Sequence, residues 1–566
     1  MEVVNMKKRT TAILLASAMA FTSLAGCAGS STATGNSGET GQNSEAAGKD
    51  SDSDTGGSGE KTKLKAVFVS HALTKSVEDM KWLQELEDQC NVEIEWEQIY
   101  QDWETVKSTR FASGDIPDIL FNATTDSDYT KYSGLFQDMS ELIETDAPNI
   151  MEMFTAEPDT QILAQTPEGQ IFGIPKCQSK WPDTNTVFFI NKQWLDNLGL
   201  KEPKTFTELE TVLKAFKEQD ANGNGDTNDE IPLDFNAYGG NNAWFNSAYS
   251  LLKLLPSMGI QLTDIVTDGY FAEEAKVKCF AVDERYKLFM KYLNRLYAQG
   301  LINSNAITND YSAFQSLSRG NENGEAVVGC VFGWEETDKF GPELYSQYTA
   351  LAPLDYDIDC APGTYDTRWS YDFDQLNMQA NRVAMSAKCE DKNAAMKFID
   401  GFYDKTRSVE TLFGGISDGC LEKTDDNNFK VLPPKDPTTD AGTWKWTNTF
   451  ADFGPLYIRK DCNIEMSEDM NNALKEREVY KDALAKVTDQ DYYPQLFMKY
   501  SEEDQNTMAL TQANINNIID NYWSLWMTGE SDIDADWDTY VKNVEAAGLE
   551  DILKIRQKAF DDYLAK

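Results

Sequence analysis

Hydrophobic and polar positions follow two different periods in the first part of the chain's folded body. Residues 63–70 end in an apolar run and residues 92–96 alternate polar and apolar side chains, so both segments predict strands. Between them, residues 77–89 space apolar side chains three or four positions apart, as in an amphipathic helix. Residues 119–121 form a short apolar run after a Gly-Asp-Ile-Pro turn. Strands that alternate with helices predict an α/β fold with a parallel-type sheet.

The same patterns continue through the middle and the end of the chain. Residues 187–190 predict another buried strand, and the polar stretch before them is a candidate crossing between two lobes. Thr205 and Glu208 form a capping box ahead of a helix with one apolar face. Two long periodic stretches predict a mostly helical last third, residues 514–526 and 537–547.

The N-terminus has the pattern of an export signal. Basic residues 7–9 precede an apolar run at 12–21, which is shorter than the about 20 residues that a membrane-spanning helix needs. The run ends in Leu-Ala-Gly-Cys at residues 24–27, which resembles the lipobox of bacterial lipoproteins. The resemblance implies a signal peptide at 1–26 and acylation of Cys27, for example with palmitate, which would anchor the protein on the extracytoplasmic face of the cell membrane. The alternative is an ordinary secretory signal whose cysteine is incidental.

Composition changes sharply behind Cys27. Residues 29–60 contain no large apolar side chain and cannot bury enough surface to fold, so we interpret 27–62 as the acylated cysteine and a disordered tether. The body that follows is too long for one compact core and predicts two lobes or more. No later segment approaches 18 uninterrupted apolar residues, so we expect no further membrane span.

Charge narrows the classes of partner. A formal net charge of −43 argues against a nucleic-acid partner, because phosphate binding requires a basic face. It also disfavours a polyanionic ligand. A local basic pocket is still compatible with this charge, because salt screens the field beyond about 8–10 Å.

Cysteine and histidine usage argues against most catalytic classes. Besides Cys27, eight scattered cysteines form no C-x-x-C pair, so zinc and thioredoxin-like sites fail on spacing, while disulfides and free thiols both stay open. The single histidine, His71, removes Ser-His-Asp and Cys-His arrangements, and we expect it in a loop after the first strand. Carboxylate pairs for glycoside hydrolysis have no diagnostic value among 94 acidic residues. We therefore predict that the protein is not an enzyme.

Residues 220–230 have the spacing of a calcium-binding loop. Oxygen-bearing side chains occupy loop positions 1, 3, 5, 7 and 9, namely Asp220, Asn222, Asn224, Asp226 and Asn228, around Gly225 at the sharp turn. Position 12 is Ile231, so the closing carboxylate must come from Asp229 or Glu230. We predict a structural Ca²⁺ ion here. The alternative is a solvated Asx turn that caps the preceding helix.

Tryptophans in polar surroundings are the candidates for ligand contact. Sugar rings stack their apolar C–H faces on aromatic side chains, while their hydroxyls need neighbouring carboxylates and amides. The candidates are Trp181, Trp244, Trp334 with the adjacent Glu335, Trp369, Trp444 and Trp446. Asn122 and Asp126 follow the strand at 119–121 and are candidate cleft residues, because ligands bind beyond the carboxyl ends of sheet strands. An Asx turn is the alternative for this pair.

Several stretches together resemble one protein family. They are residues 114–120 (GDIPDIL), 132–140 (YSGLFQDMS), 168–175 (EGQIFGIP), 189–200 (FINKQWLDNLGL), 229–233 (DEIPL) and 529–548. In order and spacing they are similar to the extracellular solute-binding lipoproteins of carbohydrate ABC importers (family 1), in the branch that includes LplA-like and alginate-oligosaccharide-binding proteins. The resemblance covers most of the chain.

The resemblance implies a two-lobed periplasmic-binding-protein-like fold of type II with a hinge between α/β lobes. We expect lobe 1 to comprise 63–177 with about 355–410, and lobe 2 to comprise about 180–352 with 411–566. It also implies the calcium ligands: side chains of Asp220, Asn222, Asn224, Asp229 and Glu230, and the carbonyl of Asp226 with Asn228 as its substitute. Compared with the family pattern, this chain has one additional residue before Asp229 and Glu230.

The function that follows is capture of an oligosaccharide in the interlobe cleft and its delivery to the permease of an ABC importer, by a monomer. Ligand that bridges both lobes would stabilise the closed state by its differential contacts. Two alternatives stay open at this point, a peptide-binding lipoprotein of an ABC importer and a surface polysaccharide-degrading enzyme. An adhesin is a third, which would show no closure on ligand.

Overall fold

The first sheet of the protein forms around its earliest predicted strands. The structure is a computed structural model that describes residues 60–237, 247–263, 269–436 and 441–565. Five strands have the order β2-β1-β3-β11-β4. They are β1 (Thr62–Val69), β2 (Val92–Ile99), β3 (Ile119–Phe121), β4 (Gly173–Cys177) and β11 (Met378–Met385). The strands predicted at 63–70, 92–96 and 119–121 are thereby confirmed.

Strand burial follows the sequence pattern. The inner strand β1 buries Leu64, Ala66, Val67 and Phe68 on both faces. β2 lies at the edge of the sheet and alternates buried and exposed residues in its first half. β1 pairs in parallel with β2 and β3, as predicted. The sequence did not predict β11, which runs antiparallel between β3 and β4 and contains a bulge between Gln379 and Val383.

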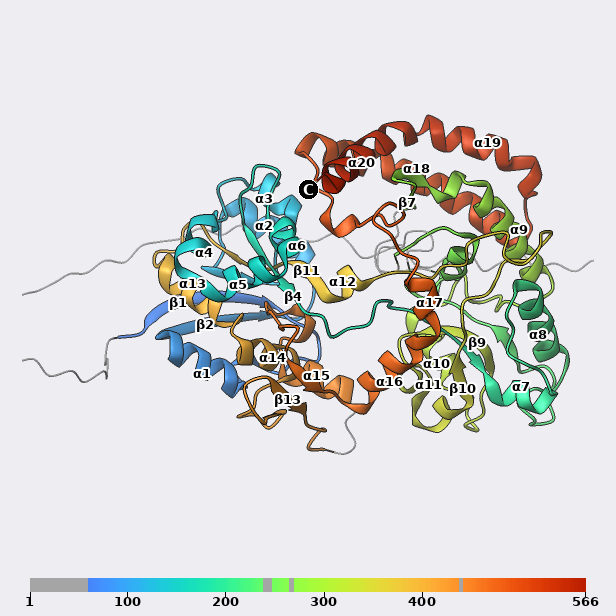
Figure 1. The fold of residues 1–566 in the computed structure, drawn as a ribbon, viewed down its shortest axis with the longest axis horizontal. Helices are drawn as coiled ribbons and strands as arrows, with labels where there is room; N and C mark the ends of the chain where they lie inside the picture. The colour runs from blue at the N-terminus through green and yellow to red at the C-terminus, as the bar shows by residue number, and fades with distance from the viewer. Residues whose placement is uncertain (1–59, 238–246, 264–268, 437–440, 566) are drawn as a thin grey trace, which may run out of the picture. The chain divides into compact units, whose positions relative to one another are not determined.

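Helices cover this sheet. They are α1 (Lys81–Cys90), α2 (Trp103–Ser113), α3 (Asp126–Lys131), α4 (Ser140–Asp146), α5 (Pro148–Ala156), α6 (Pro158–Ala164) and α13 (Lys392–Gly401). α13 packs against α1, α4 and α5, although it lies far from them in sequence (Figure 1). The helix predicted at 77–89 is a short 3₁₀ turn, Val77–Asp79, followed by α1.

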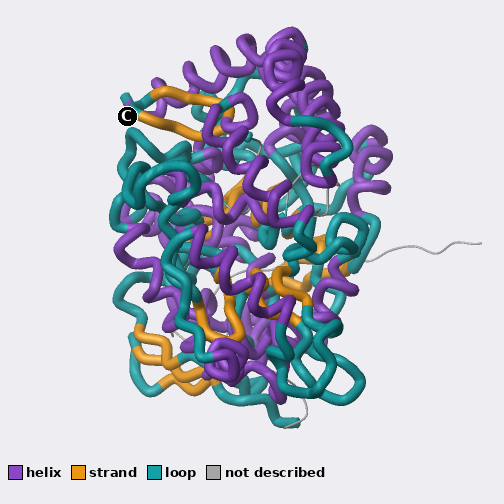
Figure 2. Tube along the Cα trace, turned by 90° about the vertical axis from the view of Figure 1, so that its right-hand side faces the viewer, coloured by secondary structure: helices purple, strands orange, loops and turns teal. Residues whose placement is uncertain are grey.

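The chain crosses to a second sheet after β4. That sheet has the order β10-β5-β9-β6. Its strands are β5 (Val187–Asn191), β6 (Ile231–Leu233), β9 (Val328–Gly333) and β10 (Tyr348–Ala350). β5 pairs antiparallel with β9 and β10, so only the β6–β9 pair is parallel. In Figure 2 the strands form separate groups, each bordered by helices.

Most of the remaining helices surround the second sheet or follow it in the chain. They are α7 (Lys192–Leu198), α8 (Phe206–Glu218), α9 (Glu284–Ala298), α10 (Tyr311–Ser318), α11 (Glu336–Leu344), α12 (Phe373–Asn377), α16 (Glu468–Glu476), α17 (Lys481–Leu484), α18 (Glu502–Thr528), α19 (Ile533–Ala546) and α20 (Leu549–Leu564). α18 packs on α9, α19 and α20, with the hairpin β7 (Tyr270–Glu273) and β8 (Lys276–Cys279) beside α20 (Figure 1). Thr205 caps α8 by accepting the N–H of Glu208. The helix predicted at 514–526 lies within α18, and the one predicted at 537–547 ends one residue beyond α19.

One late segment packs on the first sheet. It contains α15 (Ala441–Asn448) and lies after α14 (Lys405–Phe413), between two strands of a small sheet. That sheet consists of β12 (Leu421–Lys423), β13 (Asn428–Val431) and β14 (Asn463–Glu465). Phe450 stacks on Phe68 of β1 at 3.9 Å, and the backbone of residues 456–458 bonds to Cys177 at the free edge of β4. The sequence-based boundary groups 411–566 with the second lobe, and this assignment stays a prediction.

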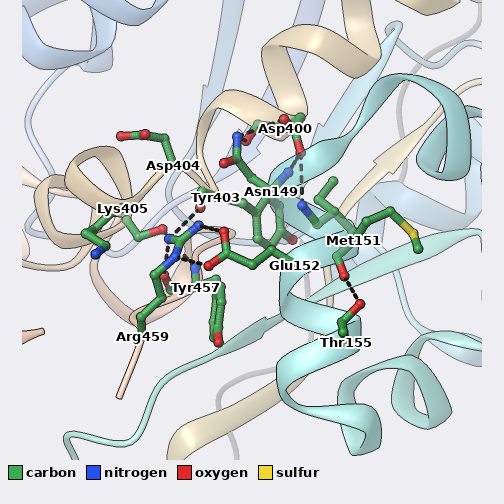
Figure 3. A network of polar contacts seen from close by, with 12 residues as sticks. Asn149, Met151, Glu152, Thr155, Asp400, Tyr403, Asp404, Lys405, Tyr457 and Arg459 are labelled. Atoms are coloured by element: carbon green, nitrogen blue, oxygen red, sulfur yellow. Dashed lines mark hydrogen bonds and ion pairs between the residues drawn. The ribbon is translucent and has the colours of Figure 1, made fainter. Parts of the chain in front are cut away.

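Polar contacts join both the late segment and α13 to α5 (Figure 3). Arg459 donates from Nε to Glu152 Oε1 at 2.8 Å, and Asp400 of α13 accepts the N–H groups of Asn149 and Ile150 at 3.0 Å. The first contact joins the late segment to α5, and the second joins α13 to α5.

The described body contains eight free cysteines, seven of them buried. The choice between disulfides and thiols is thus settled in favour of thiols for these residues. Within the described ranges, no helix combines the length and the apolar character that crossing a bilayer requires.

Candidate ligand-binding site

A cavity of about 790 Å³ brings together five of the predicted ligand residues. They are Trp181, Trp334, Glu335, Trp444 and Trp446. Its walls come from the crossing between the sheets, the end of β9 with the start of α11, the end of α12, α15 and the start of α16. Ligand pockets commonly measure about 300–1,000 Å³ and are lined by aromatic side chains with a few polar groups. The cavity has that size and composition.

Trp334 follows β9 directly and is half-buried at the cavity wall. The guanidinium of Arg477 lies 4.3 Å from the centroid of its ring and donates to the Trp334 carbonyl at 2.8 Å. One indole face is therefore covered by a cation. The indole also lines the cavity.

Glu335 acts as the N-cap of α11. Its carboxylate accepts the N–H of Asp338 at 2.9 Å and the hydroxyl of Thr337 at 2.9 Å. Both contacts hold the carboxylate at the cavity wall, where it is almost fully buried. The carboxylate of Glu335 thus has a structural role as the cap of α11.

A cluster of carboxylates adjoins this wall. Glu335, Glu336 and Glu476 each bring one carboxylate oxygen within 4.8 Å of the others. Burial raises the pKa of Glu476 to about 8, and its Oε2 has no hydrogen-bond partner. Glu476 Oε1 accepts the N–H of Glu336 at 3.0 Å.

Trp444 and Trp446 enter the cavity from α15. Trp446 stacks on His71 with ring centroids 4.3 Å apart and packs edge-on against Phe453. Trp444 Nε1 is buried and has no acceptor among the described residues. A ligand oxygen would satisfy that donor, because an unpaired buried N–H costs about 1–3 kcal/mol.

His71 was predicted only as a loop residue. The structure places it after β1, where burial lowers the pKa of its imidazole below the ordinary value. The sequence holds no signal for its contact with Trp446, because most of the chain separates the two residues.

Trp181 is only 7% exposed. Its Nε1 donates to Asp452 Oδ1 at 2.8 Å, Phe413 packs edge-on against its ring, and the ammonium of Lys445 lies 4.6 Å from its centroid. Because these contacts surround its ring, Trp181 forms part of the cavity wall and offers little surface for stacking a ligand. Sequence reasoning missed Asp452 and Lys445, which carry no local motif.

Trp369 does not line the cavity. It is 1% exposed, stacks on Tyr480 at 4.3 Å, and donates from Nε1 to the carbonyl of Thr186 at 3.2 Å. These are the contacts of a core residue. The prediction for Trp244 falls outside the described residues.

Asn122 and Asp126 lie beyond the carboxyl end of β3, but neither lines the cavity. Asn122 is left-handed (φ 53°) and joins two neighbouring strands, because its Nδ2 donates to Val69 at 2.8 Å and its Oδ1 accepts from Arg382 at 2.5 Å. Asp126 accepts from Asn381 at 2.6 Å and pairs with Lys499 at 3.3 Å. Their contacts are structural, and a role in a cleft remains a prediction.

The acidic loop, residues 220–230, is organised around its own backbone. Asp220 accepts the N–H groups of Gly223 and Gly225 at 2.8 and 2.9 Å, and Asn222 accepts that of Asn224 at 3.0 Å. Asn224 in turn accepts the N–H of Asp226 at 2.8 Å. The side chains of Asp220, Asn222 and Asn224 thus each accept N–H groups of residues two to five positions later and stabilise the turns of the loop.

The remaining predicted ligands of the loop behave differently. Asp226 Oδ1 accepts from the backbone and side chain of Asn228 at 3.0 Å. Asp229 Oδ1 and Glu230 Oε2 are buried and have no hydrogen-bond partner, and burial raises the pKa of Glu230. Buried carboxylate oxygens without donors are costly unless a cation neutralises them. The loop therefore fits a hard cation such as Ca²⁺.

Comparison with known proteins defines the class of this protein. The family model of bacterial extracellular solute-binding proteins matches residues 74–405. Because the match covers more than half of the chain, the protein belongs to that family. The predicted family and the two-lobed α/β fold are thereby confirmed.

Individual relatives are sugar-binding components of ABC transporters. The chain is 26% identical over 523 residues to the fructooligosaccharide-binding protein FusA of Streptococcus pneumoniae, covering 89% of this chain and 91% of that protein. A FusA EF-hand mutant in complex with fructo-nystose has a TM-score of 0.74, with coverage of 89% and 100%.

Two further solved structures share the fold. An HMO-binding solute-binding protein of Bifidobacterium longum infantis is 29% identical, with a TM-score of 0.80 and coverage of 89% of this chain and 99% of that one. The alginate-binding protein AlgQ2 without calcium, at 19% identity, has a TM-score of 0.62 with coverage of 89% and 98%. The second likeness concerns the fold alone.

Proposed function

We propose that this protein captures an oligosaccharide in the cavity between Trp334 and Trp446 and delivers it to an ABC importer. The observation that carries the proposal is the packing of these two indoles at the cavity wall. Arg477 lies over the ring of Trp334 and His71 stacks on the ring of Trp446, and both indoles line the same cavity. The relatives that bind fructooligosaccharide support the class of ligand.

The two indoles belong to different parts of the fold. Trp334 follows β9 of the second sheet, whereas Trp446 belongs to the segment that packs on the first sheet. A sugar stacked on both would bridge the lobes and stabilise the closed arrangement by its differential contacts. No bond is made or broken in this mechanism, so we propose a binding protein without enzymatic activity.

Three further features belong to the proposal. We propose acylation of Cys27, which would keep a monomeric binding protein beside its permease in the membrane. A Ca²⁺ ion in the acidic loop would be structural, held by Asp229 and Glu230 with the loop residues before them; the EF-hand mutant of FusA supports such a site in a relative. We also propose lobe boundaries near the crossing at 178–186, with residues 441–462 in the first lobe.

A thermal-shift panel tests the ligand class. Kestose, nystose, lacto-N-tetraose, xylotetraose and tetra-alanine would each be added to the full mature protein. A saccharide present at 100 times its Kd should raise the free energy of unfolding by about 2.7 kcal/mol. A shift with tetra-alanine and with none of the sugars would overturn the saccharide proposal in favour of a peptide carrier.

Chromatography of the same sugars after prolonged incubation tests the absence of catalysis. We expect each sugar to be recovered intact. Cleavage products that scale with protein concentration would contradict a pure transport role.

Replacement of Cys27 tests the anchor. Wild-type protein should fractionate with membranes, and Cys27→Ser should appear in the medium or stay in unprocessed form. Equal membrane association of both proteins would contradict acylation at this residue.

A further inference from the structure

One carboxylate at the cavity wall serves three donors. Asp452 Oδ1 accepts from Lys176 Nζ at 2.7 Å and from Trp181 Nε1 at 2.8 Å, while Oδ2 accepts from Lys445 Nζ at 3.1 Å. The side chain of Lys176 is fully buried and that of Asp452 is 21% exposed. Two ammonium groups hold the pKa of Asp452 well below its usual range. The group is therefore a fixed anion.

The backbone that carries Asp452 is under constraint. Ala451 has a left-handed conformation (φ 47°) although it has a Cβ and is completely buried. Such a conformation persists only where its surroundings hold it. Here the preceding Phe450 is stacked on Phe68 in the first sheet, which fixes the turn Ala451–Phe453 and aims Asp452 at the cavity.

The contact with Asp452 holds the ammonium of Lys445 in place. Its ammonium lies 4.6 Å from the ring centroid of Trp181 and 5.3 Å from that of Trp446, and its side chain is 18% exposed. Contact with Asp452 uses one of the three N–H donors of an ammonium. Lys445 also lines the cavity. Its ammonium therefore lies beside the ring of Trp446 and can donate its other N–H groups to a ligand.

We propose that Lys445 is a specificity-determining residue that donates to an oxygen of the sugar stacked on Trp446, and that Asp452 is the positioning residue that holds Lys445 for it. This inference rests on the proposed function and names how the same site selects its ligand. Lys176 completes the arrangement by occupying the other oxygen of Asp452. A charged donor fixed between two indoles selects a ligand with an acceptor oxygen next to an apolar ring face.

The test compares Lys445→Met, Asp452→Asn and their double variant with wild type by calorimetric titration. The probe is the panel saccharide with the largest wild-type shift, with kestose titrated first. Each single variant should raise Kd at least tenfold. Because Asp452 acts through Lys445, the double variant should bind no more than about twofold more weakly than Lys445→Met.

Two controls separate positioning from folding. Glu152→Gln breaks an ion pair with Arg459 in the same late segment but touches no cavity residue, so Kd should stay within twofold. Lys445→Arg keeps the charge and should recover most of the affinity lost in Lys445→Met. If Asp452→Asn does not fold, the contrast between Met and Arg at 445 decides.

The outcomes distinguish the two levels of proposal. Variants that lower the melting temperature while leaving Kd within twofold of wild type, or effects that multiply in the double variant, would overturn the roles of Lys445 and Asp452 alone. Wild type that binds none of the sugars would overturn the proposed function and this inference with it.

Discussion

The acidic loop and the aromatic cavity build a site in opposite ways. In the loop, neighbouring side chains and backbone N–H groups hold one another within residues 220–230. In the cavity, three of the four indoles are held by a partner from a distant segment, as Trp334 is by Arg477, Trp446 by His71 and Trp181 by Asp452. A few contacts also join the loop to other segments, such as that from Asn197 to the Ala221 carbonyl, but most of its bonds are local. The cavity, in contrast, takes its walls from segments of both sheets. An ion in the loop should therefore change stability, and a ligand in the cavity should change conformation.

Removal of the loop ion is expected to have the largest effect. Calcium at 100 times its Kd should raise the free energy of unfolding by about 2.7 kcal/mol, since it would neutralise the buried oxygens of Asp229 and Glu230. Calorimetric melting of chelated protein, before and after added calcium, measures this. Glu230→Gln is expected to lose the response. A change in sugar affinity of more than tenfold on chelation would contradict the view that the loop ion affects stability alone.

Loss of one stacking face comes next. Trp446→Ala should weaken sugar binding by about 2 kcal/mol, or roughly thirtyfold, as for a buried aromatic anchor. Trp369→Phe is the matched control, because Trp369 packs in the core; it should lower the melting temperature and leave Kd unchanged. Equal losses of affinity in the two variants would show that core packing, and not the exposed indole face, sets the affinity.

The pH dependence of stability should report Glu476 beside the cavity. Burial raises its pKa from 4.5 to about 8, so the folded state keeps a proton that the unfolded chain has lost between these values. Stability should fall as pH rises from about 4.5 to 8. Glu476→Gln should remove this slope and be more stable than the wild type at pH 9, as measured by urea unfolding. Parallel pH profiles of wild type and variant would refute the assignment.

Replacement of His71 is expected to have the smallest effect. His71→Phe keeps a ring against Trp446, so affinity at pH 7 should change less than twofold. Burial lowers the pKa of His71, so the wild type should lose a little stability as pH falls below 6.5, whereas the variant should not. A large loss of affinity at pH 7 would mean that the imidazole itself contacts the sugar.

Sequence patterns predict local features of this protein well. The strands at 62–69 and 92–99, the cap of α8 and the oxygen-rich loop all depend on spacings of a few residues. The candidate tryptophans could be chosen by their polar neighbours, and four of the six line one cavity. Trp369 has similar neighbours but packs on Tyr480, a contact that no local pattern encodes.

Long-range pairings mark the limit of such patterns. Asp452 has no motif, and its three donors come from residues 176, 181 and 445. The antiparallel β11 within the first sheet, and the return of Phe450 to β1, are likewise choices between competing partners that only tertiary packing resolves.

The position of β11 also governs how the chain can acquire its structure. It fills the gap between β3 and β4, yet about 200 residues separate it from β4 in the sequence. Until that late strand arrives, β3 and β4 present unpaired edges, which are templates for association with other chains. Closing so long a loop is slow, and the second sheet is synthesised within it. The two lobes are therefore coupled during folding, and a truncation before residue 378 should leave the first lobe incomplete and prone to aggregate.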